Sequence, residues 1–173
     1  MSKREIPVGI VAGVVGGLVA SWVMNEFMAG PGAALTKAVE SPAEQRLVEM
    51  RSDGEDATMK MADEIAEIAT GGRHLTHEQR EKAGPVVHYA FGALMGGVYG
   101  GLAEVSSAAT AGFGTTFGSV LFAGADLFMV PAMKLSKPLE EYPASSYATP
   151  MAAHLVYGAT TELVRRFVRR LLD

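Results

Sequence analysis

Six acidic and imidazole side chains stand inside otherwise apolar stretches of this sequence. They are Glu26, His88, Glu104, Asp126, His154 and Glu162. A charged group in hydrocarbon is costly, so such residues are expected to face the interior of a helix bundle and to pair there. Histidine titrates near neutral pH and can pass protons. One hypothesis is therefore a proton or small-cation site made of two acids and two histidines, with Glu104 and Glu162 as its exit.

A simpler interpretation gives the same residues a structural role. In this interpretation His88 and His154 donate hydrogen bonds across helices, and the acids pair with them or with backbone groups at helix ends. Polar groups are expensive in lipid unless they are bonded, whatever their function. The sequence favours this interpretation over conduction.

Two short motifs suggest an internal duplication. His88-Tyr-Ala-Phe-Gly92 and His154-Leu-Val-Tyr-Gly158 share their first and last residues. Each follows an apolar stretch that carries an acid, Glu26 in the first case and Asp126 in the second. Two hairpins in the same orientation would place both acids and both histidines in the outer leaflet.

The apolar stretches that must position these residues are long enough to cross a membrane. A hydrocarbon core of about 30 Å needs about 20 apolar residues in a helix. We predict an all-α integral membrane protein, in one domain over residues 1–173, with four transmembrane helices and a polar helical segment over 30–84. The predicted spans are 6–29, 85–104, 112–132 and 148–168.

Glycines recur every four residues along the first three predicted spans, and the fourth contains Gly158. In water they would weaken a helix, but in lipid they let two helices approach closely. We expect helix packing through the following positions: Gly9, Gly13, Gly17, Gly92, Gly96, Gly100, Gly114, Gly118 and Gly158.

The polar segment is expected to hold short amphipathic helices on the membrane surface. Ser41, Pro42 and Glu44 form an N-cap, a first-turn proline and a capping-box acid, which predict a helix over residues 42–51. A second helix is predicted over 56–70, ended by two glycines. Thr76 and Gln79 predict the cap of a third helix, which leads through a proline into the second span.

Basic residues set the expected orientation. The flanks at the two ends carry Lys3, Arg4 and four arginines over residues 165–170, against two lysines in the loop before the last span. The positive-inside rule then places both termini in the cytoplasm. The segment over residues 30–84, with eleven acids and seven Lys or Arg, would face outward.

Several classes of function have no support in the sequence. The absence of cysteine excludes thiolate chemistry and disulfides. No basic surface suited to nucleic acid is present. His74, His77, Glu78 and Glu81 have metal-ligand character but lie in a polar, glycine-flanked loop, so no metal site is expected. No nucleophile or cofactor motif is found, and we expect neither an enzyme nor a cofactor.

Four stretches of the chain resemble a known family. They are SWVMNEF over residues 21–27, HYAFGALMGGVYG over 88–100, the LSKP and YP of the loop over 135–143, and HLVYGATTELVRR over 154–166. Together they resemble the YagU-like group of small bacterial inner-membrane proteins of unknown function. The resemblance covers most of the chain outside residues 30–72. It implies a multi-pass protein of the bacterial inner membrane and brings no reaction or catalytic residue.

The sequence therefore leads to two expectations about function. The first is a structural or interaction unit that associates with itself or with other membrane protein subunits through its glycine faces, with the lipid bilayer as its surroundings. The alternative is a proton or small-cation channel or transporter that uses the buried acids and histidines.

Overall fold

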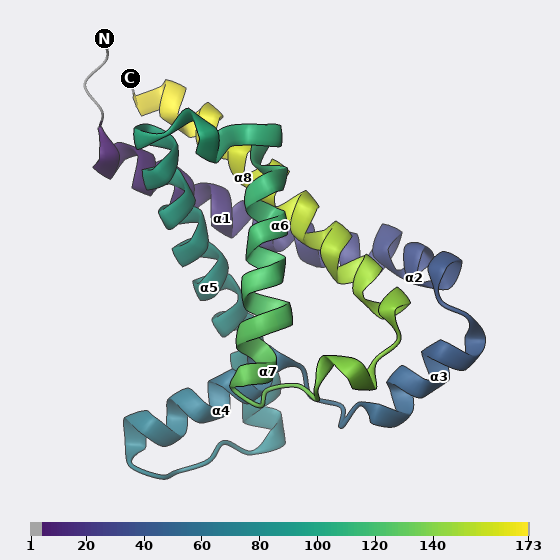
Figure 1. Cartoon of the computed structure of the whole chain (residues 1–173). Helices are drawn as coiled ribbons and strands as arrows, with labels where there is room; N and C mark the ends of the chain where they lie inside the picture. Colours follow the sequence, from purple (N-terminus) through teal and green to yellow (C-terminus); the bar gives the residue numbers. More distant parts are fainter. Residues whose placement is uncertain (1–4, 173) are drawn as a thin grey trace.

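The computed structural model describes residues 5–172, which are helical apart from short connections and contain no strand (Figure 1). The described part is thus all-α, as predicted. Its α-helices are α1 (Ile6–Phe27), α2 (Ala33–Val39), α3 (Pro42–Arg51), α4 (Ala57–Thr70), α5 (His77–Val105), α6 (Thr115–Gly124), α7 (Val130–Ala132) and α8 (Ala148–Leu172). Short π-helical and 3-10 segments join them: η1 (Met28–Gly32), η2 (Ser107–Gly114), η3 (Ala125–Met129), η4 (Leu139–Glu141) and η5 (Ala144–Tyr147).

The first apolar helix runs past the boundary predicted for its span. Helix α1, the π-helical segment η1 and α2 form one continuous helix from Ile6 to Val39. Pro31 lies inside η1. Proline lacks a backbone N–H and its ring crowds the preceding turn, so the wider π turn lets the helix continue beyond it.

Helix α3 begins and ends where the capping residues predicted. The Ser41 N–H donates to the Glu44 carboxylate at 2.7 Å, and the Ser41 hydroxyl accepts from the Glu44 N–H at 3.3 Å. This reciprocal pair satisfies two of the N–H groups that the first turn of a helix leaves free. The predicted capping box is confirmed.

The predictions for α4 and α5 are also confirmed. Asp56 caps α4, which ends at Gly71 in the left-handed conformation. A capping box of Thr76 and Gln79 begins α5, and this helix continues through Pro85 into the second apolar stretch. The polar α4 packs beside the start of α5, so the surface helices are continuous with the bundle (Figure 1).

Helices α1 and α5 cross at backbone contact because glycines of both helices face each other. A Cβ built on Gly9 would lie 2.7 Å from the carbonyl oxygen of Gly100, and one built on Gly13 would lie 2.9 Å from the Cα of Gly100. Real Cβ atoms do not come this close, so larger residues would separate the two helices. The pairs that meet are Gly9 with Gly100, Gly13 with Gly96 and Gly17 with Gly92.

Helix α8 packs against α1 and α6. A Cβ on Gly16 would lie 2.8 Å from the carbonyl oxygen of Thr161 in α8. Beside this contact α8 meets α6, where Gly114 faces Gly158 and Gly118 faces the carbonyl of His154. The Tyr157 hydroxyl donates to the Gly92 carbonyl at 2.6 Å and ties α8 to α5.

The crossing of α1 with α5 resembles that of α6 with α8 in where the His–Gly motifs and the π-helical segments lie. Gly92 lies one turn after His88 and meets Gly17, while Gly158 lies one turn after His154 and meets Gly114. The π-helical segments begin at Met28 and at Ala125, which stand at equal distances from Gly17 and Gly114. By this register Ala29, not Glu26, is the residue of the first half that corresponds to Asp126.

The third apolar helix begins later than predicted. We placed its start at residue 112, but Gly112, Phe113 and Gly114 all have positive φ, and α6 begins at Thr115. Gly114 therefore serves as a left-handed residue before α6 as well as a contact for α8. Sequence periodicity alone does not distinguish a helical glycine from one that caps a helix.

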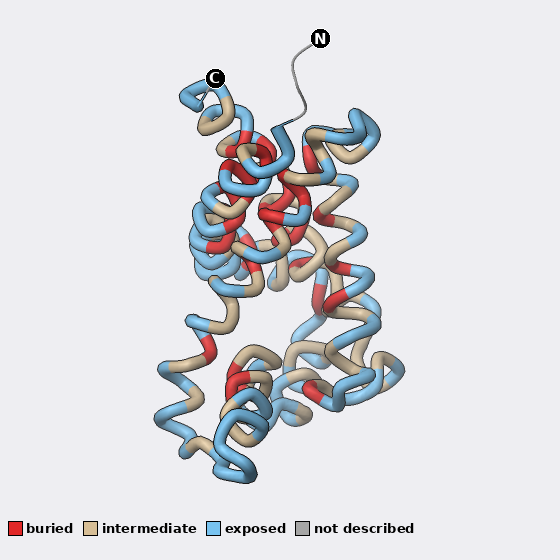
Figure 2. The backbone as a smooth tube through the Cα atoms, turned by 90° about the vertical axis from the view of Figure 1, so that its left-hand side faces the viewer, coloured by how far each residue is buried: buried red, intermediate tan, exposed pale blue. Residues whose placement is uncertain are grey.

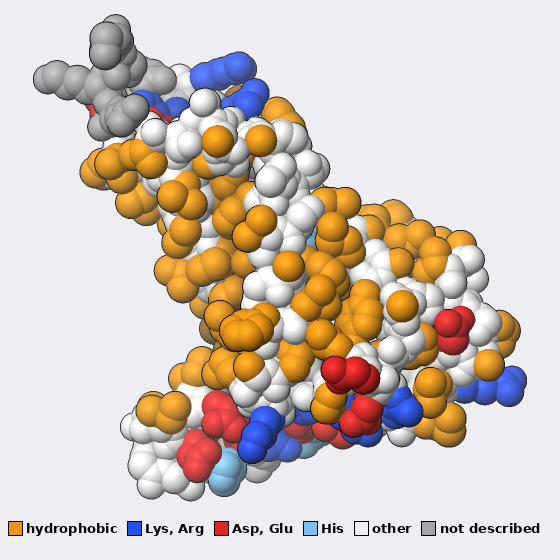
Figure 3. Space-filling view, in the orientation of Figure 1, with side chains coloured by type: hydrophobic (Ala, Val, Ile, Leu, Met, Phe, Trp, Pro, Cys, Tyr) orange, Lys and Arg blue, Asp and Glu red, His pale blue; other side chains and the backbone are white. Residues whose placement is uncertain are grey.

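Three helical stretches of the described chain are long and apolar enough to cross a membrane: Ile6–Val39, His77–Val105 and Ser107–Ala132, the last of which includes the segment η2 before α6. Hydrophobic side chains cover the middle of the face in Figure 3, whereas charged side chains gather toward its ends. Buried residues are concentrated in the half of the molecule that contains the start of α1 and the end of α8 (Figure 2). Lys3 and Arg4, on which the orientation partly rests, lie outside the described residues.

Candidate functional site

Charged side chains of α5 and α8 meet at one end of the bundle. This is the end where α1 starts and α8 ends (Figure 1). In α8 these residues are spaced by three or four, which places them on one face of the helix. We call the following set the terminal charge network: Tyr99, Glu104, Glu162, Arg165, Arg166 and Arg169.

Glu162 is the centre of this network and is fully buried. Its carboxylate accepts from the Tyr99 hydroxyl at 2.9 Å, from Arg165 Nε at 2.8 Å and from Arg166 Nε at 2.6 Å. A further bond of 3.2 Å joins Arg165 Nη2 to the second carboxylate oxygen. A buried carboxylate is stable only when bonds of this kind replace its hydration.

Glu104 connects α5 to the same arginines. Its Oε1 atom accepts from Arg169 Nε at 3.1 Å and lies 3.6 Å from Arg165 Nη1. Gly9 of α1 leaves space for this side chain, because a Cβ at that position would overlap it. Arg169 also lies 3.9 Å from the half-exposed Glu5. Three helices are therefore held together at this end by charge as well as by packing.

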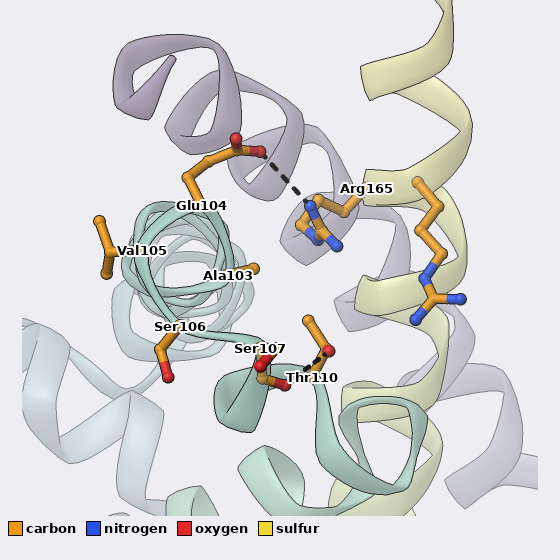
Figure 4. A pocket seen from close by; sticks show the side chains of 8 residues that line it. Ala103, Glu104, Val105, Ser106, Ser107, Thr110 and Arg165 are labelled. Atoms are coloured by element: carbon orange, nitrogen blue, oxygen red, sulfur yellow. Dashed lines mark hydrogen bonds and ion pairs between the residues drawn. The ribbon is translucent and has the colours of Figure 1, made fainter. Parts of the chain in front are cut away.

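An open cavity of about 700 Å³ lies beside the network. Figure 4 shows Glu104 and Arg165 directed at each other across it, with Ser107 and Thr110 supplied by the segment after α5. The Thr110 hydroxyl donates to the Ser107 carbonyl at 3.0 Å. The lining residues are Ala103, Glu104, Val105, Ser106, Ser107, Thr110, Arg165 and Arg166.

Asp126 and His154 form a second polar group farther along the bundle. His154 is buried, and its Nδ1 atom lies 3.0 Å from the Pro150 carbonyl and 3.7 Å from Asp126 Oδ2. The Phe122 ring covers the imidazole at a centroid distance of 5.5 Å. Asp126 lies in the π-helical segment η3, where the widened turn precedes Pro131. This pair links α8 to the third apolar helix.

The structure does not gather all four residues of the predicted outer group. His88 is half-buried, contacts Tyr89 edge-on, and its Nε2 atom has no hydrogen-bond partner among the described residues. Glu26 is exposed on α1, and it makes no ion pair or hydrogen bond with His88, Asp126 or His154 in the described chain. The six predicted residues thus divide into the Asp126–His154 pair with His88 near enough to act on Asp126 electrostatically, Glu26 apart from them, and the two glutamates of the terminal charge network.

One further buried polar atom is unpartnered in the described part of the chain. The Ser21 hydroxyl is almost fully buried on α1, where it faces Gly92 at the crossing with α5. Gly92 already accepts from Tyr157 through its carbonyl. Both unpartnered atoms, on Ser21 and His88, therefore belong to helices that cross at this level.

Outside the bundle, His74 and His77 pair with acids in α4 and in the segment just before it. Asp63 accepts from the Leu75 N–H at 2.6 Å and from His74 at 3.0 Å, and these bonds hold the pKa of Asp63 below its usual range. The same hydrogen bond raises the pKa of His74. His77 and Arg80 bond to Glu55, and the pKa of Glu55 is lowered. His74 and His77 therefore bond to different carboxylates.

The arginines of α8 were not assigned to the site from sequence. They served there only to set the expected orientation of the chain, but Arg165 is buried and turned onto Glu162. The spacing of Glu162, Arg165 and Arg166 was the available signal, because i,i+3 and i,i+4 positions meet on a helix. Tyr99 carried no comparable signal, since its role depends on a tertiary contact with α8.

A protein family of unknown function, DUF1440, matches residues 58–163, more than half of the chain. The chain belongs to this family. The matched region begins in α4 and ends in α8, so it contains Tyr99, Glu104 and Glu162, together with the Asp126–His154 pair. No curated protein and no solved structure matches the chain.

Proposed function

We propose that this DUF1440 member is a non-catalytic structural or interaction unit of a membrane, which associates with itself or with another membrane protein. The observation that carries the proposal is an apolar groove of about 380 Å³ between α1 and α5. It is lined by Ile10 and Val14 of α1 and by Leu94, Gly97, Val98, Gly101 and Leu102 of α5.

The groove has the composition of a surface for another helix. Its rim is apolar and open, with Leu94 60% exposed and Ile10 42% exposed. Gly97 and Gly101 form a second row of small residues, beside which the side chains of Val14 and Ile10 of α1 lie. In lipid, where apolar burial does not drive association, such small residues permit the close backbone approach that holds helices together. The proposed occupant is an apolar transmembrane helix.

We also propose four membrane-crossing helices, with α8 as the fourth and both termini in the cytoplasm of a bacterium, as the resemblance to YagU-like inner-membrane proteins implies. The support is that α8 packs along the whole bundle and that its charged end is neutralised internally. The glycine contacts of α1 with α5 and of α6 with α8 supply the packing. A reporter fused after Asp173 tests the orientation, since an outward location would contradict four spans with a cytoplasmic start.

The absence of cysteine makes a direct test of self-association simple. A single Leu94→Cys variant places one thiol on the groove, and a Val120→Cys variant places one on α6, outside the groove and at a similar exposure of 65%. Disulfide formation requires two Cα atoms about 4.4–6.8 Å apart. If a second copy occupies the groove, oxidation in native membranes is expected to yield dimers of the Leu94→Cys variant and few of the control.

Native mass in a mild detergent separates the two forms of the proposal. A dimer or small homo-oligomer that crosslinks through Leu94→Cys identifies a second copy as the occupant. Fixed-ratio co-purification with another polypeptide, without self-crosslinking, identifies a different subunit. A lone monomer that crosslinks at neither position would contradict the proposal.

One observation favours the alternative of proton or cation conduction. Asp126 and His154 are 3.7 Å apart within the apolar part of the bundle, and the Nε2 atom of His88 lacks a partner among the described residues. Ionisable groups in such positions often mark a transport path. Conduction would require flux in proteoliposomes that depends on pH and is lost in Asp126→Asn. No flux, or flux unchanged by this substitution with Glu64→Gln as control, would rule it out.

A further inference from the structure

Arg166 carries hydrogen-bond donors that the terminal charge network does not use. Its Nε atom donates to Glu162, but its two terminal nitrogens donate to none of the described residues. The guanidinium lies over the Phe113 ring at 4.8 Å from the centroid, which restrains it at the wall of the cavity. The side chain is 45% exposed, so a ligand can reach it from outside.

Hydroxyl groups stand on the other wall of the same cavity. The side chains of Ser106 and Ser107 line it, and neither hydroxyl forms a side-chain hydrogen bond with the described part of the chain. Thr110 lies beside them. Guanidinium donors together with hydroxyl donors are the groups that hold phosphate oxygens in proteins.

The described carboxylates near this cavity are all paired with arginines. Arg165, Arg166 and Arg169 face the carboxylates of Glu104 and Glu162, and both carboxylates already accept bonds from these arginines. The half-exposed Glu5 lies 3.9 Å from Arg169. The Glu104 carboxylate in the lining is therefore neutralised, and the terminal nitrogens of Arg166 are the donors that remain available for an anion.

The cavity also lies beside the ends of two apolar helices, where a headgroup would be expected. It opens where α5 ends and α6 has not yet begun, which is the end of two apolar helices. Basic pockets between helix ends are the usual place where anionic lipid headgroups bind. We propose that this cavity binds a phosphate-type anion, through Arg166 and the Ser106 and Ser107 hydroxyls, supplied either by the headgroup of an anionic phospholipid or by a soluble phosphate.

Lipid retention tests the proposal. The full chain is delipidated, reconstituted with a mixture of phosphatidylglycerol and phosphatidylcholine, and analysed by native mass spectrometry for the lipid that stays bound. Loss of charge-assisted hydrogen bonds is expected to lower phosphatidylglycerol retention roughly tenfold in Arg166→Gln. The matched control is Arg170→Gln, which removes the same charge from an exposed position of α8 outside the cavity.

A second variant addresses the risk that Arg166→Gln disturbs the fold through Glu162. Ser106→Ala with Ser107→Ala removes two hydroxyls that bond to no described side chain, and it is expected to lower retention several-fold without altering helicity. The soluble source is tested separately by adding inorganic phosphate to detergent-solubilised protein. An upward shift in the unfolding temperature, relative to chloride at equal ionic strength and absent in Arg166→Gln, would identify a soluble phosphate.

Three results would overturn the proposal: equal retention of both lipids with no effect of phosphate, equal losses in Arg166→Gln and Arg170→Gln, or unchanged retention in the double serine variant. This experiment is independent of the groove between α1 and α5, because none of its residues lines the cavity. Failure of one proposal therefore leaves the other unaffected.

Discussion

Replacing Glu162 by Gln should show how much the terminal charge network contributes to the fold. The substitution preserves the shape of a side chain that is fully buried but removes its charge. Arg165, whose side chain is 9% exposed, would then keep only Glu104, at 3.6 Å, as a counter-charge. Arg166 would lose its short bond to Oε1, although it can turn to solvent.

Removing one partner of a buried ion pair costs about 3–5 kcal/mol. Because Glu104 still offsets part of the charge on Arg165, we expect Glu162→Gln to lower the free energy of unfolding by about 3 kcal/mol. The measurement is reversible unfolding in mixed micelles with increasing dodecyl sulfate, followed by far-UV circular dichroism. Glu64→Gln, on an exposed face of α4, is the control for loss of a carboxylate.

The double variant Glu162→Gln, Arg165→Gln makes the test sharper. If an uncompensated Arg165 causes the loss, removing its charge as well should restore part of the stability, so the two effects are not additive. A loss below about 1 kcal/mol in Glu162→Gln would refute this account, since such a value is typical of a solvent-exposed pair. Additive losses in the double variant would refute it too.

Two further predictions concern other parts of the chain. Gly13→Val should destabilise the α1–α5 contact by about 1–3 kcal/mol or more in the same assay, because its Cβ meets backbone, whereas Gly124→Val, with open space around it, should cost far less. In the hairpin, the lowered pKa of Asp63 means that its stabilisation exists above the unfolded pKa and is lost as pH falls through the folded value. The raised pKa of His74 acts oppositely, and its contribution is lost as pH rises through the folded value. Hydrogen exchange of the Leu75 amide should therefore be slowest at pH values between the folded-state pKa of Asp63 and that of His74. Exchange that does not vary across this pH range, after correction for the intrinsic rate, would contradict the role given to these two residues.

Local signals predicted the surface helices closely. Ser41 and Glu44 fixed the start of α3, and Gly71 fixed the end of α4, because caps depend on residues within one turn. The same reasoning failed at Gly114. A glycine in a four-residue row looks identical whether it continues a helix or turns the chain before one, and only the positive φ of its neighbours distinguishes the two.

The candidate site was less accessible from sequence because its bonds join distant helices. Glu162 was singled out as a charge in an apolar stretch. Its partner Tyr99 lies on α5, and no residue near Tyr99 in the sequence predicts this contact. Glu26 was compared with Asp126 because each acid lies in the apolar stretch before a similar motif, but the glycine crossings place Ala29 at the position that corresponds to Asp126. Long-range pairings of this kind require the helix packing to be known first.

The buried bonds of α8 have a consequence for how the protein is made. Arginine and acidic residues oppose entry of a helix into lipid, each by up to about 3 kcal/mol near the centre of the bilayer. Outside α8, the carboxylate that faces Arg165 is Glu104 of α5, and α5 leaves the ribosome earlier. If α8 crosses the membrane as proposed above, α5 must stay near the insertion site during synthesis until α8 arrives, and a chain that stops before α8 would leave Glu104 and Tyr99 without their partners in α8.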